Sequence, residues 1–146
     1  MNKLTEIAAQ ACLVAALAFA AGCGSGAGAG YKDGVYRAVS SKDQRGAYGE
    51  ITITVKGGEI SDSKYVTYLK EGEGKIKDQD YGKVNGAISN RDFYNKAQFA
   101  VKAMQLYNDK LKQNKTPKGI DALSGATESY RQFMEAADKA LKAAQK

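Results

Sequence analysis

One short run of the sequence gathers residue types that can do chemistry, Asp121-Ala-Leu-Ser-Gly-Ala-Thr127. It combines a carboxylate, two hydroxyls and a glycine. Helical periodicity begins directly after it, so Thr127 is expected where free backbone N–H groups and the positive end of a helix face solvent. Such a helix start favours bound phosphate, and Gly125 and Ala126 keep the approach clear of bulky side chains. These residues would therefore be compatible with a phosphate bound at the start of the helix.

An ordinary helix start accounts for the same residues. Ser124 or Thr127 would be its N-cap, with Gly125 in the turn, and physical chemistry alone favours this simpler explanation. Asp121 could orient the loop, and Ser124 could hydrogen-bond to the neighbouring backbone. Both interpretations of the run stay open at this point.

The residue types that the chain lacks exclude most other chemistry. It has no histidine, which rules out Ser-His-Asp and Cys-His nucleophilic catalysis and histidine-ligated metals. Its two cysteines, Cys12 and Cys23, fall within and at the end of an export signal, so the mature domain has no free thiol and no metal site is expected. A redox function would need an organic cofactor. A hydrolase would depend on carboxylates such as those of residues 71, 78 and 80, in a charged loop that is more simply a solvated surface.

The first residues have the pattern of a secretory signal. Lys3 gives a basic start, residues 7–21 are almost entirely apolar, and Ala20-Ala-Gly-Cys23 resembles the lipobox of bacterial lipoproteins, although leucine is more usual than Ala20 at that position. We therefore expect residues 1–22 to be a lipoprotein signal peptide, Cys23 to be lipidated, for example with palmitate, and residues 23–30 to be a flexible Gly/Ala/Ser tether. The expected location is the extracytoplasmic face of the cell membrane, with a lipid anchor.

The charge of the chain says less about its partners. The formal net charge is +6, and removing residues 1–22 leaves it unchanged because Lys3 and Glu6 cancel. A basic domain favours acidic partners such as cell-wall polymers or anionic lipid headgroups. The basic residues are scattered among acidic ones, however, which is more typical of a solvated surface than of a binding patch. Nucleic acid is not an expected partner outside the membrane.

Residues 31–146 are expected to form one domain, and its first half is strand-like. Residues 34–39 are rich in β-branched and aromatic side chains, and residues 50–55 alternate strictly, with Ile51, Ile53 and Val55 on one face. Gly57-Gly58 predicts a two-residue hairpin turn, with residues 59–69 as the returning strand. Residues 70–90, polar and glycine-rich, are expected to be a long surface loop.

The second half is helical. Asn90 is a plausible N-cap for a helix that begins near Arg91, and the chain turns at residues 116–119, where Pro117 lies. A last helix is expected from about Glu128. The predicted apolar stripes are Phe93, Ala97, Ala100, Val101, Met104, Tyr107 and Leu111 in the first helix, and Tyr130, Phe133, Ala137, Leu141 and Ala144 in the second. The economical arrangement is an α+β fold, a small antiparallel sheet with two helices packed on one face.

The 121–127 run also matches the Asp-x-x-Ser/Thr-Gly-Ala-Ser/Thr signature of the FMN-binding domain family. That family includes domains of the Rnf and sodium-pumping NADH:quinone reductase complexes and extracellular flavin lipoproteins. Asp33-Gly-Val-Tyr36, the hairpin of residues 54–60 and Asp80-Tyr-Gly82 resemble the family as well, so the resemblance covers essentially all of residues 31–146. It implies covalently bound FMN, attached through a phosphoester to Thr127 by an ApbE-type flavin transferase, with Asp121, Ser124, Gly125 and Ala126 completing the cofactor-binding motif. Asp121 could then be recognised by that modifying enzyme.

The resemblance implies an electron carrier rather than a stand-alone catalyst. It would take electrons from a quinone-linked or flavoprotein donor in the membrane and pass them to an extracytoplasmic acceptor. Four tyrosines are candidates for stacking on the flavin ring, namely Tyr65, Tyr68, Tyr81 and Tyr130. The alternative is a non-redox lipoprotein of the cell envelope, a ligand-binding or interaction module in which the motif is unused.

Overall fold

The computed structural model describes residues 30–145. The predicted signal peptide, Cys23 and the predicted tether up to residue 29 lie outside these residues. Within residues 30–145, no helix combines the length and the apolar character needed to cross a bilayer.

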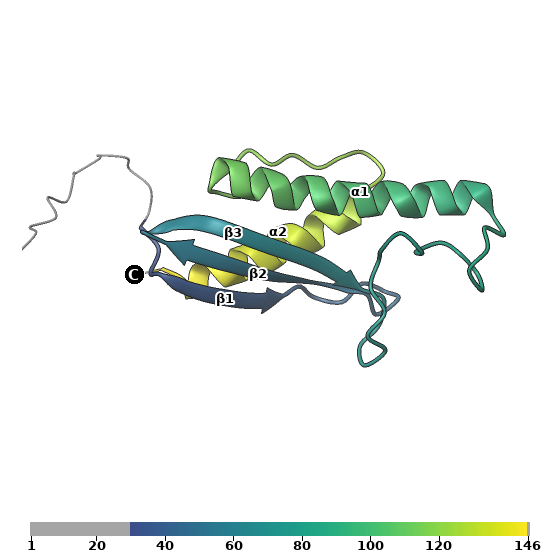
Figure 1. Cartoon of the computed structure of the whole chain (residues 1–146), viewed down its shortest axis with the longest axis horizontal. Helices are drawn as coiled ribbons and strands as arrows, with labels where there is room; N and C mark the ends of the chain where they lie inside the picture. Colours follow the sequence, from purple (N-terminus) through teal and green to yellow (C-terminus); the bar gives the residue numbers. More distant parts are fainter. Residues whose placement is uncertain (1–29, 146) are drawn as a thin grey trace, which may run out of the picture.

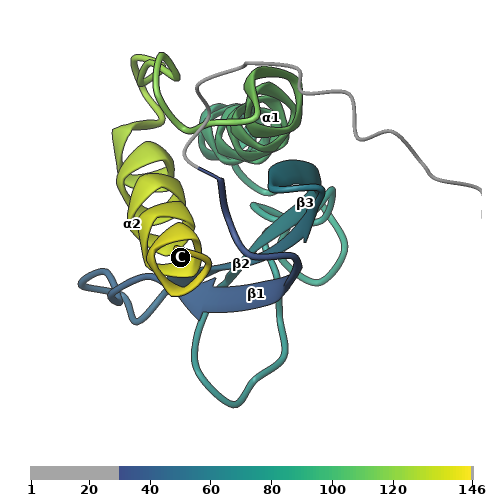
Figure 2. The ribbon, with the colours of Figure 1, turned by 90° about the vertical axis from the view of Figure 1, so that its left-hand side faces the viewer.

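The described chain forms a three-stranded antiparallel sheet followed by two helices, which confirms the predicted α+β class (Figure 1). The strands lie side by side in chain order. Both helices cover the same face of the sheet. Figure 2 shows α1 above β3, and α2, next to α1, lies over β1 and β2. The elements are β1 (Gly34–Val39), β2 (Tyr48–Lys56), β3 (Glu59–Tyr68), α1 (Arg91–Asn114) and α2 (Thr127–Ala143).

The alternation predicted for the central strand is confirmed. Ile51, Ile53 and Val55 of β2 are buried beneath the helices, because side chains two residues apart in a strand share a face. The register between β2 and β3 shifts between Thr54 and Val55, and the extra residue in β3 moves the buried positions from Ile60 to residues 63, 65 and 67.

The Gly57-Gly58 turn is also where predicted, with both glycines at positive φ (63° and 79°), as a two-residue hairpin turn requires. Asp33 fixes this turn, since its two carboxylate oxygens accept the N–H groups of Gly57 and Gly58 at 2.9 and 2.8 Å. The N–H of Lys32 donates to the carbonyl of Ala144 at 2.7 Å. The first described residues are therefore held against the hairpin and the C-terminal end of α2.

The long helix α1 begins as predicted, with the Asn90 side chain accepting the N–H of Phe93 at 2.9 Å. Its buried stripe runs from Ala97 to Leu111. The inclusion of Phe93 in that stripe is wrong, because the Phe93 side chain is 45% exposed. The first turns of α1 extend past the strands to where the 70–90 segment lies, so they have no sheet beneath them to cover Phe93 (Figure 1).

An aromatic cluster joins the sheet to both helices. Phe133 of α2 is fully buried, with its ring 5.1 Å from that of Tyr65 in β3 and 5.8 Å from that of Tyr107 in α1, measured between centroids. Tyr65 meets Phe133 edge to face, a favourable arrangement for aromatic rings. This cluster fixes the position of α2, whose first residue is Thr127.

Candidate functional site

The loop that leads into α2 is held in place by a buried tyrosine. The side chain of Tyr107 is fully buried, and its hydroxyl accepts the N–H of Leu123 at 2.9 Å. The carbonyl of Leu123 in turn accepts the N–H of Ala126 at 2.9 Å. The loop is thereby connected to α1 immediately before Thr127.

No side chain caps the start of α2. Ala126 occupies the N-cap position, with no side-chain hydrogen bond to the helix. The prediction that Ser124 or Thr127 is the N-cap of this helix is therefore wrong. Thr127 is instead the first helical residue and is exposed. The N–H groups of residues 127–129 have no carbonyl acceptor within the helix, because an α-helix leaves its first donors unpaired. A phosphate on the Thr127 hydroxyl would lie beside these donors.

The other motif residues shape the approach to Thr127. Gly125 has φ +87°, a conformation that glycine adopts without steric cost, and a Cβ on it would lie 3.5 Å from the Phe99 ring. Asp121 and Ser124 are exposed, and neither side chain forms a hydrogen bond with residues of the described part of the chain. The expected role of Asp121 in orienting the loop has no contact to support it. Recognition by a modifying enzyme fits its exposure.

A groove of about 750 Å³ opens next to the start of α2. Cofactor pockets commonly measure about 300–1,000 Å³, so the groove is large enough for a flavin. Thr127 does not line it, but its neighbours on both sides do. The lining also comes from the β1–β2 loop, the segment after β3 and the first half of α1, with Lys42, Asp43, Gln44, Arg45, Ala47, Leu69, Lys77, Tyr81, Phe93, Ala100, Gly125, Ala126, Glu128, Ser129 and Arg131 as the lining residues.

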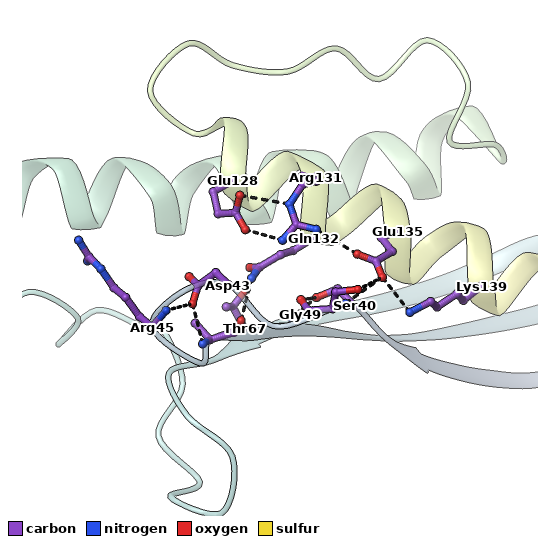
Figure 3. Close-up of polar contacts among 12 residues, drawn as sticks. Ser40, Asp43, Arg45, Gly49, Thr67, Glu128, Arg131, Gln132, Glu135 and Lys139 are labelled. Atoms are coloured by element: carbon purple, nitrogen blue, oxygen red, sulfur yellow. Dashed lines mark hydrogen bonds and ion pairs between the residues drawn. The ribbon is translucent and has the colours of Figure 1, made fainter.

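The β1–β2 loop forms a wall of the groove because polar contacts hold it against α2 (Figure 3). The Gln132 side chain donates to the carbonyl of Ala47 at 2.9 Å, and Asp43 accepts the N–H groups of Arg45 and Ala47 at 2.8 Å each. Glu135 accepts both the N–H and the hydroxyl of the neighbouring Ser41. This wall is preorganised, so ligand binding does not have to order it.

Glu135 is the centre of this network. Its carboxylate accepts hydrogen bonds from Lys139 at 2.8 Å and from Ser41, and it pairs with Arg131 at 3.2 Å. These donors, Lys139 first and Ser41 next, lower the pKa of Glu135 from 4.5 to about 2. A carboxyl group with a lowered pKa in the folded state stabilises the fold above its unfolded pKa. That stabilisation is lost as the pH falls from about 4.5 towards 2.

We therefore expect Glu135→Gln to lower the free energy of unfolding at pH 7 by about 1–2 kcal/mol. Hydrogen bonds to charged groups contribute more to stability than bonds between neutral groups. Solvent reduces this contribution here, because the Glu135 carboxylate is partly exposed. The difference from wild type should shrink between pH 4.5 and pH 2, as measured by urea unfolding across that range. Glu59→Gln, at the exposed hairpin, is the matched control and should change stability by less than about 0.5 kcal/mol. A difference that persists unchanged at pH 2 would contradict the assignment.

The lining of the groove also includes a tyrosine, Tyr81, whose position α1 determines. The Gln98 side chain donates to the carbonyls of Asp78 and Tyr81, at 3.1 and 2.8 Å. Gly82, at φ +98°, lets the segment approach α1 so closely that a Cβ there would lie 2.8 Å from that of Ala97. Tyr81 is thus held at the edge of the groove, in contact with Phe93.

Tyr81 is the one candidate stacking tyrosine that lines the groove in the described part of the chain. Tyr65 is buried against Phe133, and Tyr68 stacks on Tyr48 with a 5.2 Å centroid separation. Tyr130 packs edge to face on Tyr107 in the core. None of these three rings is among the residues that line the groove.

The sequence pattern does not predict that Tyr107, Gln98 and Lys77 shape the site. Tyr107 belongs to the apolar stripe of α1, but its hydroxyl could have indicated a contact with another segment, because a buried tyrosine generally needs a hydrogen-bond partner. Gln98 and Lys77 gave no local signal. Their importance depends on which distant segments meet at the groove.

The fold and the site together define a small α+β ligand-binding domain, with an uncapped helix start beside a preorganised groove. The sequence profile of the FMN-binding domain matches residues 46–142. The chain therefore belongs to the FMN-binding domain family, and the groove beside the start of α2 is large enough for a flavin.

Two solved structures are similar to this chain. The crystal structure of the CPE2226 protein from Clostridium perfringens shares 26% sequence identity, with a TM-score of 0.61 over 78% of this chain and 88% of that one. A solution NMR structure of a protein from Clostridium thermocellum shares 24% identity, with a TM-score of 0.48 over 79% and 93% of the two chains. No curated protein matches the chain significantly.

Proposed function

We propose that this protein is a membrane-anchored electron carrier whose FMN is attached to Thr127 through a phosphoester. The observation that carries the proposal is the uncapped start of α2, where the exposed Thr127 lies between residues that line a groove of flavin size. The family supplies the identity of the cofactor, FMN. A covalent bond suits an extracytoplasmic carrier, because a dissociable cofactor would be lost by dilution.

Attachment is a group transfer by an ApbE-type flavin transferase. The Thr127 hydroxyl oxygen forms a bond to the phosphorus of the FMN half of FAD, and the bond from that phosphorus to the AMP half breaks. AMP leaves, and the hydroxyl proton passes to a base on the transferase. No electrons are transferred in this step. The exposure of Thr127 and the small side chains of Gly125 and Ala126 give the transferase access.

The residues of the chain bind and orient the cofactor. The free N–H groups at the start of α2 and the positive end of its dipole favour the phosphoester anion, by about 0.3–1 kcal/mol for an exposed site. Tyr81, Leu69 and Phe93 offer apolar surface to a flat ring in the groove. Once bound, the flavin supplies reversible electron transfer, which the side chains of this domain do not provide.

The first described residues and the start of α2 lie at opposite ends of the domain. Lys32 is bonded to Ala144 beyond the C-terminal end of α2, whereas Thr127 begins that helix (Figure 1). With 17 residues, α2 separates the two ends by about 25 Å. In our proposal, Cys23 carries the lipid and residues 23–30 act as a flexible tether with a typical span of about 15 Å. The domain could then turn between a donor in the membrane, quinone-linked or a flavoprotein, and an extracytoplasmic acceptor.

Co-expression of the full chain with and without an ApbE-type transferase tests the proposal. Intact mass should rise by one FMN less one water only with the transferase, and the yellow colour should survive denaturation. Cys23→Ser should move the protein from the membrane fraction to the soluble fraction of the cell envelope. A wild-type chain that stays colourless beside a transferase active on another substrate would support the non-redox alternative instead.

A further inference from the structure

The groove contains a half-buried lysine, Lys77, which forms no ion pair with any of residues 30–145. Its ammonium nitrogen lies 5.5 Å from the centroid of the Tyr81 ring. That distance is within the range of a cation–π contact, so the charge is directed over the aromatic wall of the groove. Both residues line the groove that Gly125 and Ala126 border.

Two of the other cations that line the groove already have carboxylate partners. Lys42 pairs with Glu71, and Arg131 pairs with Glu128 at 2.6 Å and with Glu135 at 3.2 Å. Arg45 is exposed, so water solvates its charge. Lys77 is therefore the lining cation that combines partial burial with the lack of an ion pair in the described part of the chain.

The backbone of Lys77 is fixed to the sheet. Its N–H donates to the carbonyl of Thr67 at 2.8 Å, and the neighbouring Ile76 forms a bridge with Tyr68 at the end of β3. Leu69 donates to the carbonyl of Lys75 at 2.8 Å, which closes the turn between them. A lysine in an unattached surface loop would have a variable position, but the backbone of Lys77 is hydrogen-bonded to β3.

Burial lowers the pKa of Lys77, because an ammonium group loses favourable hydration there. The charges that face it have smaller effects, with Asp43 and Glu128 raising its pKa and Arg45 lowering it. A cation that has lost water without gaining a carboxylate partner is stabilised by any anion that enters the groove. Lys77 is thus suited to a ligand that becomes negative.

We propose that Lys77 raises the reduction potential of the flavin. Its ammonium group would pair with the negative charge that the flavin ring gains on reduction. The inference rests on the proposed attachment of FMN to Thr127. Uptake of two electrons from a donor and one proton from solvent leaves one negative charge on the ring system. A cation in the groove stabilises that reduced form more than the neutral oxidised form, which shifts the equilibrium towards reduction.

The test compares the midpoint potentials of flavin-loaded wild type, Lys77→Met, Lys77→Arg and the control Lys56→Met, by redox-dye titration at pH 7. Lys56 is exposed beside the hairpin turn, so its loss changes net charge without changing the groove. At a fixed potential, Lys77→Met should lower the ratio of reduced to oxidised flavin at least tenfold, which is about 30 mV for two electrons. Lys77→Arg and Lys56→Met should stay within twofold of wild type.

Each contrary result has a distinct meaning. A Lys77→Met protein that gains the mass of FMN but keeps the wild-type potential overturns this inference and leaves the proposed function standing. Equal shifts in Lys77→Met and Lys56→Met also overturn it, because net charge would then be the cause. A wild type that is never flavinylated overturns both. If Lys77→Met fails to fold, as circular dichroism would show, Lys77→Gln replaces it with the same expectations.

Discussion

Thr127→Ala is expected to abolish the attachment of FMN, while Thr127→Ser retains it. Alanine has no oxygen to form the phosphoester, whereas serine presents its hydroxyl from the same helical position. Intact mass after co-expression with the transferase should show no added FMN in the alanine variant and one in the serine variant. The effect is all-or-none, because no other group at the start of α2 occupies the place of this hydroxyl.

The fold should not change in this experiment. The Thr127 side chain is exposed and caps nothing, so its loss should alter the free energy of unfolding by less than about 0.5 kcal/mol. Ser124→Ala is the matched variant, since it removes the other hydroxyl of the motif. It should still gain the mass of FMN, mapped by peptide digestion to Thr127. If Thr127→Ala still gains FMN, or if only Ser124→Ala fails to gain it, the phosphoester must lie on a residue other than Thr127.

The sheet and the start of α1 could be predicted because local patterns determine them. A period of two in residues 50–55, with glycines at 57 and 58, specifies a hairpin whatever surrounds it, and the Asn90 cap depends on its immediate neighbours. The exposure of Phe93 could not be predicted in this way. Its position fits the helical period, but whether the sheet extends beneath it depends on where the strands end relative to α1.

The motif depends on residues that are close in the sequence, whereas its supporting residues come from distant segments. Thr127 and Gly125 could be proposed as site residues because they lie two residues apart in the sequence and match a family signature. The groove beside them brings together residues from the β1–β2 loop, the segment after β3 and both helices. The bond from Leu123 to Tyr107 and the clamp of Gln98 on the 78–81 segment span 16 to 20 residues. Such contacts follow from the packing, which a single sequence does not specify.

Phe133→Ala is expected to cause the largest loss of stability, about 3–5 kcal/mol, because it removes a fully buried ring and leaves a cavity. Against a typical total of about 5–15 kcal/mol for a domain, this is a large fraction. Urea unfolding monitored by circular dichroism measures it. Val35→Ala is the control, since that side chain in β1 is 67% exposed, and should cost less than about 1 kcal/mol.

The same substitution should slow flavin attachment, although Phe133 lies outside the motif. Phe133 packs against Tyr107, whose hydroxyl holds Leu123 and hence the loop before Thr127. A cavity beside the Tyr107 ring allows it to move, so the loop should present Thr127 less often in the conformation that the transferase binds. The initial rate of mass gain, measured without urea at a temperature where both proteins are folded, should fall severalfold in Phe133→Ala and stay unchanged in Val35→Ala. A normal rate in a destabilised Phe133→Ala domain would show that the loop holds its conformation independently of the aromatic cluster.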